Sequence, residues 1–89
     1  MTKNSPTYPF KNSPEKFVEY KLGMSGSFYN YLFKAYLKAD QVNRAKLKIT
    51  FPELVHADLY QTQKNYYLHL INWAIDNGYP ESRVKKYLG

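Results

Sequence analysis

The residues that could do chemistry are few, and their spacing matches no catalytic or metal-binding motif. His56 and His69 are the two histidines of the chain, and neither has a carboxylate at the spacing of a zinc site. Asp58 lies two residues after His56, and side chains two residues apart on a helix point away from each other. His69 shares the polar side of its segment with asparagines and an aspartate, which is typical of a solvated residue. The sequence therefore predicts no metal site.

Covalent and acid–base catalysis also lack candidates. The chain has no cysteine, so a nucleophile would have to be a serine, threonine, lysine or tyrosine beside a base. The Ser-Gly-Ser segment at residues 25–27 lacks the surrounding nucleophile motif and is typical of a turn and a helix cap. Glu15 and Glu19 lie four residues apart, but Lys16 and Lys21 flank them, as on a solvated helix face. Since the four glycines also form no phosphate-binding loop, we expect a protein that is not an enzyme and needs no cofactor.

These side chains must be positioned by a small fold. At 89 residues, with 44% hydrophobic and 18% aromatic residues, the chain has the composition of one globular domain. It has no window of roughly 18 apolar residues, as a membrane span requires, and no apolar signal segment at its start. Because the absence of cysteine also suits a reducing compartment, we expect a cytoplasmic protein without a membrane partner.

The beginning of the chain differs from the rest. Residues 1–13 contain Pro, Ser and Asn without apolar periodicity, so we expect a flexible, extended arm. Residues 14–89 are expected to form a single helical domain. Its first helix begins at Ser13 and Pro14, a favourable cap followed by a favourable first residue, and ends before Gly23.

The most apolar element is a helix over residues 28–39, with Ser27 as its expected N-cap. Only Asn30, Lys34 and Lys38 form a polar stripe, so about two-thirds of the circumference is apolar. Such a helix is central to the fold or partly covered by a partner. The residues expected to face inward are Phe28, Leu32, Ala35, Tyr36 and Ala39, with Tyr29, Phe33 and Leu37 extending that face.

The next segment has the pattern of an ordinary surface helix over residues 41–49, with Asp40 as its cap. Its narrow apolar stripe is formed by Val42, Ala45 and Ile49, while the basic residues face elsewhere. Residues 46–51 alternate between polar and apolar side chains, which is also typical of a strand. No partner strand is evident, so a helix is favoured.

The last third of the chain leaves one choice open. An apolar stripe runs through residues 53–77 without Gly or Pro, which favours one long helix, while the polar run at 61–65 equally favours a break. Asn77 and Gly78 end this region, and a last short turn follows Pro80. The whole pattern predicts an all-α fold, a compact bundle of four or five helices built around residues 28–39 and 66–77.

The positive charge is concentrated in the middle of the chain. The net charge is +6, and residues 25–50 contain one acid, Asp40. The basic residues there are Lys34, Lys38, Arg44, Lys46 and Lys48. Such a basic face attracts polyanions or acidic protein surfaces, although it also serves solubility alone. Together with the C-terminal Arg83, Lys85 and Lys86, it forms the basis of a nucleic-acid-binding hypothesis.

The aromatic content supports a second hypothesis, protein binding. Ten tyrosines exceed what a core of this size can bury fully, and tyrosine is enriched at interfaces. The alternative is that the rings line the rim of the core. The candidates for an exposed cluster are Tyr66, Tyr67, Trp73, Tyr79 and Tyr87.

Residues 26–60 carry a longer pattern. It consists of Gly26-Ser27-Phe28-Tyr29, Leu32-Phe33, Ala35, Lys38-Ala39-Asp40, Asn43, Lys46-Leu47, Phe51-Pro52-Glu53, Val55 and Ala57. This pattern resembles small, often basic, uncharacterised proteins of bacterial phages and mobile elements. Leu54 and His56 depart from it, because that stretch is usually acidic and charged. These proteins have no assigned activity, so the resemblance carries over no functional residues.

The resemblance implies a setting. A small phage-type protein acts in the cytoplasm of the host cell, commonly by binding a host enzyme, a defence complex or nucleic acid. Our hypothesis is a non-catalytic module that binds and modulates or inhibits a host or defence-system protein, with a small basic DNA- or RNA-binding protein as the alternative. A homodimer that buries surplus tyrosine surface is consistent with either.

Overall fold

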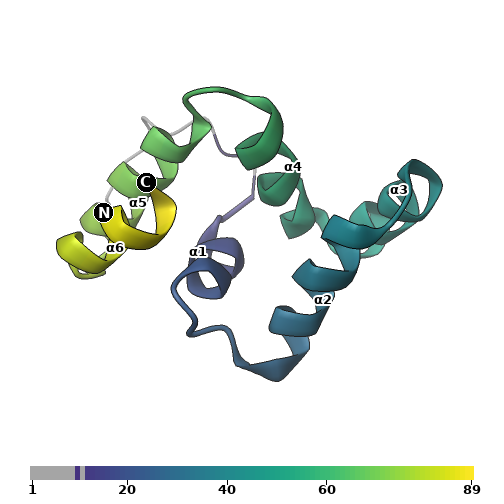
Figure 1. Ribbon diagram of the computed structural model, residues 1–89, viewed down its shortest axis with the longest axis horizontal. Coiled ribbons are helices and arrows are strands. Elements are labelled where there is room, and N and C mark those ends of the chain that lie inside the picture. The colour runs from purple at the N-terminus through teal and green to yellow at the C-terminus, as the bar shows by residue number, and fades with distance from the viewer. Residues whose placement is uncertain (1–9, 11) are drawn as a thin grey trace.

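In the computed structural model, which describes residue 10 and residues 12–89, the chain folds into helices joined by short turns (Figure 1). No strand occurs in these residues, so the all-α prediction is confirmed and residues 46–51 are not a strand. Most of the expected arm, residues 1–9 and 11, lies outside the described part. The elements are α1 (Glu15–Lys21), α2 (Gly26–Lys38), α3 (Gln41–Thr50), the 3₁₀ turn η1 (Pro52–Leu54), α4 (Val55–Thr62), α5 (Tyr66–Asp76) and α6 (Glu81–Leu88).

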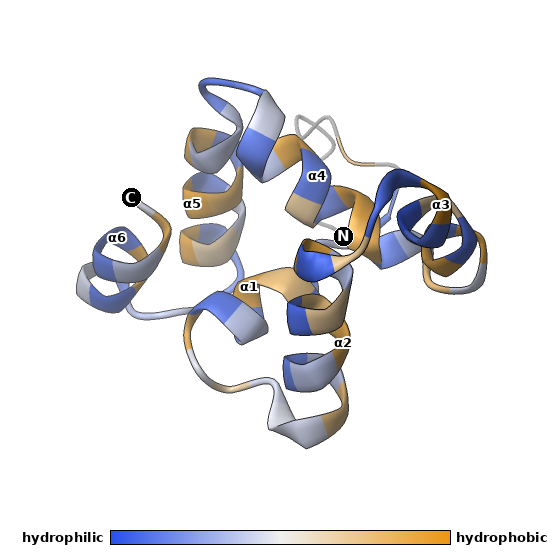
Figure 2. Cartoon of the chain, turned by 45° about the vertical axis from the view of Figure 1, so that its right-hand side comes forward, coloured by the Kyte–Doolittle hydropathy of each residue, from blue (hydrophilic) through white to orange (hydrophobic). Residues whose placement is uncertain are grey.

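Helix α1 is the centre of the bundle and packs against α2, α5, α6 and η1. In both views α5 and α6 lie side by side at one end of the molecule, and α3 lies at the other end (Figures 1 and 2). The buried core follows this arrangement, since it draws on every helix except α3. Its largest fully buried apolar side chains are Phe17, Leu22, Phe33, Tyr36, Leu54, Leu70 and Leu88.

Local capping signals determine several helix ends. Gly23 has φ 76°, a left-handed conformation that suits glycine, and Met24 N–H donates to the Glu19 carbonyl at 2.8 Å. Gly78, with φ 92°, ends α5 in the same way. At the start of α3, the Asp40 side chain accepts a hydrogen bond from Asn43 N–H at 2.8 Å, as its predicted capping role requires.

Helix α2 faces the core with only part of the side expected: Tyr36 is buried as predicted, but Ala35 is exposed. It begins at Gly26, one residue before the predicted cap Ser27, and no side chain caps it. Phe33 is fully buried, whereas Phe28, predicted to face inward, is 58% exposed. Because about two-thirds of this helix is apolar, the pattern did not specify which part of that arc packs on the core.

The choice left open in residues 53–77 is resolved as two helices. Helix α4 ends at Thr62 and α5 begins at Tyr66, so the polar run contains the break. The turn between them directs α5 back toward α1 and α6, where Leu70 and Ala74 are fully buried. The last segment, expected as a short turn, is the eight-residue helix α6, which buries Val84 and Leu88.

Candidate protein-binding surface

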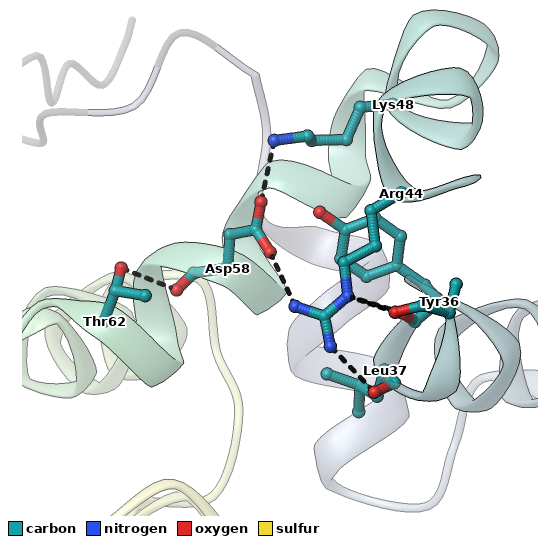
Figure 3. A network of polar contacts seen from close by, with 7 residues as sticks. Tyr36, Leu37, Arg44, Lys48, Asp58 and Thr62 are labelled. Carbon is teal, nitrogen blue, oxygen red and sulfur yellow. Dashed lines mark hydrogen bonds and ion pairs between the residues drawn. The ribbon is translucent and has the colours of Figure 1, made fainter. Parts of the chain in front are cut away.

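Helix α3 is attached to α2 by an arginine. Arg44 Nε donates to the backbone carbonyls of Tyr36 at 3.0 Å and Ala39 at 3.1 Å, and Nη2 donates to that of Leu37 at 2.8 Å. The last carbonyls of a helix lack partners within the helix and carry partial negative charge. The planar guanidinium therefore satisfies the C-terminal end of α2 with several donors at once (Figure 3).

The same arginine joins α3 to α4 through Asp58. Arg44 Nη1 lies 3.7 Å from one carboxylate oxygen of Asp58, and Lys48 Nζ lies 2.8 Å from the other. Figure 3 shows both cations converging on this carboxylate from α3. Burial raises the pKa of Asp58, but the Lys48 and Arg44 cations outweigh burial and hold the pKa below its usual value.

Tyr36 packs against the guanidinium of Arg44 at this junction. Its ring is fully buried, and the Arg44 guanidinium lies over it at 5.3 Å from the centroid. Its buried hydroxyl makes no hydrogen bond, although it lies close enough to Asp58 for the two groups to affect each other. Burial raises the pKa of Tyr36, and the Asp58 carboxylate raises it further.

This junction turns the apolar stripe of α3 toward solvent. Val42 is 65% exposed, Ile49 is 82% exposed, and Ala45 between them is exposed as well. Helix α3 is a surface helix as predicted, but its apolar stripe faces solvent instead of the body of the molecule. The physical reason is that Arg44, Leu47 and Lys48 form the inward side, where the two cations reach α2 and α4.

The outward side of α2 adds two exposed aromatic residues. Tyr31 is 68% exposed and lies next to Lys38 and Lys34 on the helical wheel. Phe28 reaches the end of α3, because its ring lies 5.7 Å from the ring of Phe51, which follows that helix. We call these exposed side chains the α2–α3 outer surface: Phe28, Tyr31, Lys34, Lys38, Val42, Ala45, Lys46 and Ile49.

The predicted basic face divides into two groups. Arg44 and Lys48 face inward and share Asp58. Lys34, Lys38 and Lys46 are exposed, and none pairs with a carboxylate of the described residues. The outer surface therefore combines apolar side chains with three cations that are free to meet an acidic partner.

The tyrosines proposed as an exposed cluster do not form one. Tyr66 is 3% exposed, because its ring packs in the core and its hydroxyl lies 2.7 Å from His56 Nδ1. Tyr67 and Tyr79 are half-buried, and only Tyr87 is exposed. The two explanations of the high tyrosine content were an exposed cluster and rings that line the rim of the core. The second explanation fits most of these positions. The sequence did not identify the exposed aromatic residues on α2, which are Phe28 and Tyr31. The available signal was the position of Tyr31, which falls beside the polar Lys34 and Lys38 on the helix.

The C-terminal basic residues are exposed but far from α3. Arg83 Nη2 donates to the Leu22 carbonyl at 3.0 Å, Lys85 pairs with Glu81, and Lys86 lies against the Tyr87 ring. Because α6 and α3 occupy opposite ends of the molecule, these cations and those of the outer surface do not form one continuous basic face (Figure 2).

The two histidines have different environments. His56 is buried, and because Nε2 lies 3.0 Å from the Asn12 carbonyl, Nε2 carries the proton and Nδ1 accepts from the Tyr66 hydroxyl. Burial lowers the pKa of His56, and the Asn12 and Ser13 backbone and the Glu53 charge only partly offset this. His69 is exposed.

A cavity of about 450 Å³ lies beside His56 and is lined by Val55, Leu59 and Tyr66 among others. In the described part of the chain, no three side chains that could bind a metal ion lie together.

No protein-family model, curated protein or solved structure matches this chain. Among the described residues, no helix has the length and apolar character needed to cross a bilayer.

Proposed function

We propose that this chain is a non-catalytic binding module of a phage or mobile element that modulates or inhibits a host or defence-system protein in the host cytoplasm. The observation that carries the proposal is the orientation of α3, whose Val42 and Ile49 side chains point to solvent. Single exposed apolar residues are common, but an apolar stripe on a helix beside exposed aromatic rings is typical of an interaction site.

The phage setting rests on the resemblance of residues 26–60. Every residue of the α2–α3 outer surface lies within that segment. The segment thus contains the side chains that the fold leaves uncovered as well as those that hold α3 in place. Both sets would be needed by a module that presents this surface to a partner.

Nucleic-acid binding is the second candidate, and it is favoured by Lys34, Lys38 and Lys46, which pair with no carboxylate in the described part of the chain. Phosphate binding depends on cations and on accessible aromatic faces. The apolar stripe of α3 offers neither, and the basic residues of α6 lie at the opposite end of the molecule. For these reasons a protein partner accounts for more of the outer surface.

The test is a pull-down from host lysate, with and without nuclease. The wild-type chain is compared with the double variant Val42→Gln/Ile49→Gln, which removes the apolar stripe without adding charge. Leu68→Gln is the matched control, since Leu68 is an exposed apolar residue on α5. We expect one host protein to stay bound to wild type and to the control after nuclease treatment and a wash at moderate salt. The double variant should not retain this protein. Capture of nucleic acid that elutes at moderate salt would contradict the proposal.

A further inference from the structure

We propose that the partner presents an acidic amphipathic helix, which lies along α3 with its apolar side on Val42, Ala45 and Ile49. This inference rests on the proposed function and specifies the chemistry of the partner. Three features of the surface carry it: the shape of the stripe, the charge around it and the backbone of α3.

The stripe has the shape that a helix needs. Its members are spaced at i, i+3 and i+7, so they lie along one side of α3 over about 10 Å. The small Ala45 lies between the larger Val42 and Ile49. A small residue at the centre of the stripe lets the axis of a second helix approach closely, with the larger side chains on either side of the contact.

The charge specifies an acidic partner. Helix α3 contains Arg44, Lys46 and Lys48 and no acid, and Asp58 of α4 already faces two of these cations. Lys46 lies next to Val42 on the helical wheel of α3 and has no carboxylate partner in the described residues. The exposed Lys34 and Lys38 on α2 have none there either. A second copy of this chain would bring the same cations together. Acidic side chains that flank the partner's apolar face would instead be attracted to them.

The backbone of α3 favours a helix over an extended segment. The amides of α3 are used in its own hydrogen bonds, with the first turn capped by Asp40. An extended peptide needs backbone partners, usually at a sheet edge, and the described chain has no strand. A helix satisfies its own backbone and needs only the apolar contact and the flanking charge.

The inference is tested with a synthetic fluorescent peptide of about 18 residues, long enough for five turns of helix. One form has leucines along one side and glutamates beside them, and the control form has lysines in place of the glutamates. Fluorescence anisotropy measures the binding of each peptide to the full chain. We expect the glutamate peptide to bind wild type and Leu68→Gln, and to bind Val42→Gln/Ile49→Gln at least about tenfold more weakly.

Lys46→Glu tests the charge separately. This variant should lower the affinity for the glutamate peptide about threefold, a small effect because a single exposed charge pair contributes little. It should also reduce the salt dependence of binding, because one attractive charge is lost. In the NMR spectrum of the chain, the glutamate peptide should shift the amide signals of residues 42–49. Equal binding of the two peptides, equal binding to the double variant, or shifts confined to α5 and α6 would overturn the inference.

The pull-down separates this inference from the proposed function. If the glutamate peptide fails to bind while the captured host protein is still lost from the double variant, the acidic helix is wrong and the binding surface stands. If the host protein is retained by the double variant, both are wrong. Sedimentation that shows a dimer in wild type and a monomer in the double variant would identify a second copy as the occupant and overturn the inference.

Discussion

The Arg44 guanidinium and the Asp58 carboxylate face each other at 3.7 Å across the junction of α3 and α4. Lys48, one turn further along α3, lies 2.8 Å from the other carboxylate oxygen. Both cations thus turn toward the body of the molecule, and the residues on the opposite side of α3 turn outward. An apolar stripe reaches solvent because a charged side holds the helix in place.

Asp58→Asn should weaken this junction. The variant removes the charge that Arg44 and Lys48 share, and we expect the free energy of unfolding at pH 7 to fall by about 1 to 2 kcal/mol, since the site is partly solvated. Urea denaturation followed by circular dichroism measures the change. Glu81→Gln on α6 is the control, because its ion pair with Lys85 is exposed to solvent, and it should change stability much less.

The stability difference between wild type and Asp58→Asn should depend on pH. The pKa of Asp58 is lowered in the folded chain, so its contribution is present above the unfolded pKa of about 3.9 and is lost as pH falls through the lower, folded value. The difference in stability between wild type and Asp58→Asn should therefore shrink below about pH 4. A difference that stays constant from pH 7 to pH 3 would show that the ion pairs contribute nothing.

Tyr36→Phe should leave the chain as stable as wild type or stabilise it by up to about 1 kcal/mol. The reason is that the Tyr36 hydroxyl is buried without a hydrogen bond, and such a group costs about 1 to 3 kcal/mol. Tyr29→Phe is the matched comparison, because the Tyr29 hydroxyl donates to Glu53 at 2.6 Å and its removal should destabilise the chain. Thermal melts measure both; a clear loss in Tyr36→Phe would mean that its hydroxyl bonds to Asp58.

His56→Gln should remove a pH dependence near neutrality. Burial lowers the pKa of His56 in the folded chain, so the unfolded chain binds the proton more readily. Wild-type stability should accordingly fall as pH drops below about 6.5, down to the folded pKa. His56→Gln should lose this slope, while His69→Gln, which changes an exposed residue, should keep it. Denaturation curves between pH 5 and pH 8, with NMR titration of the His56 ring, decide the matter.

The Val42→Gln/Ile49→Gln variant should be as stable as wild type, within about 0.5 kcal/mol. Both side chains are exposed, and glutamine is a better helix former than valine or isoleucine. Leu54→Ala, at a fully buried position, should cost about 2 to 5 kcal/mol. If the double variant lost as much as Leu54→Ala, the stripe of α3 would be part of the core.

Much of the fold was predictable because it depends on local signals. Asp40 caps α3 through its own side chain, and Gly23 and Gly78 adopt the left-handed backbone that ends α1 and α5. The break at residues 63–65 was undecided, since the apolar stripe continues across it and tertiary packing determines the turn. The buried side of α2 was undetermined for a similar reason, because apolar residues cover most of its circumference.

The candidate site was predicted only in part. The sequence shows the basic residues, but which of them pair with a carboxylate depends on Asp58, which lies in another helix. Burial of the Val42, Ala45 and Ile49 stripe was the ordinary expectation from periodicity, and the contacts of Arg44 with α2 reverse it. The absence of any acid within α3 was the one signal that its cations needed a partner elsewhere.

The most direct test is the accessibility of a thiol on the stripe of α3. The chain has no cysteine, so Ile49→Cys and Leu68→Cys each provide a single reactive group. Without peptide, both variants should react rapidly with a maleimide. With excess glutamate peptide, labelling of Ile49→Cys should slow by about tenfold and that of Leu68→Cys should not change. Slow labelling of Ile49→Cys in the absence of peptide would contradict the exposure of the stripe. A labelling rate of Ile49→Cys that the peptide does not change would contradict binding at the stripe.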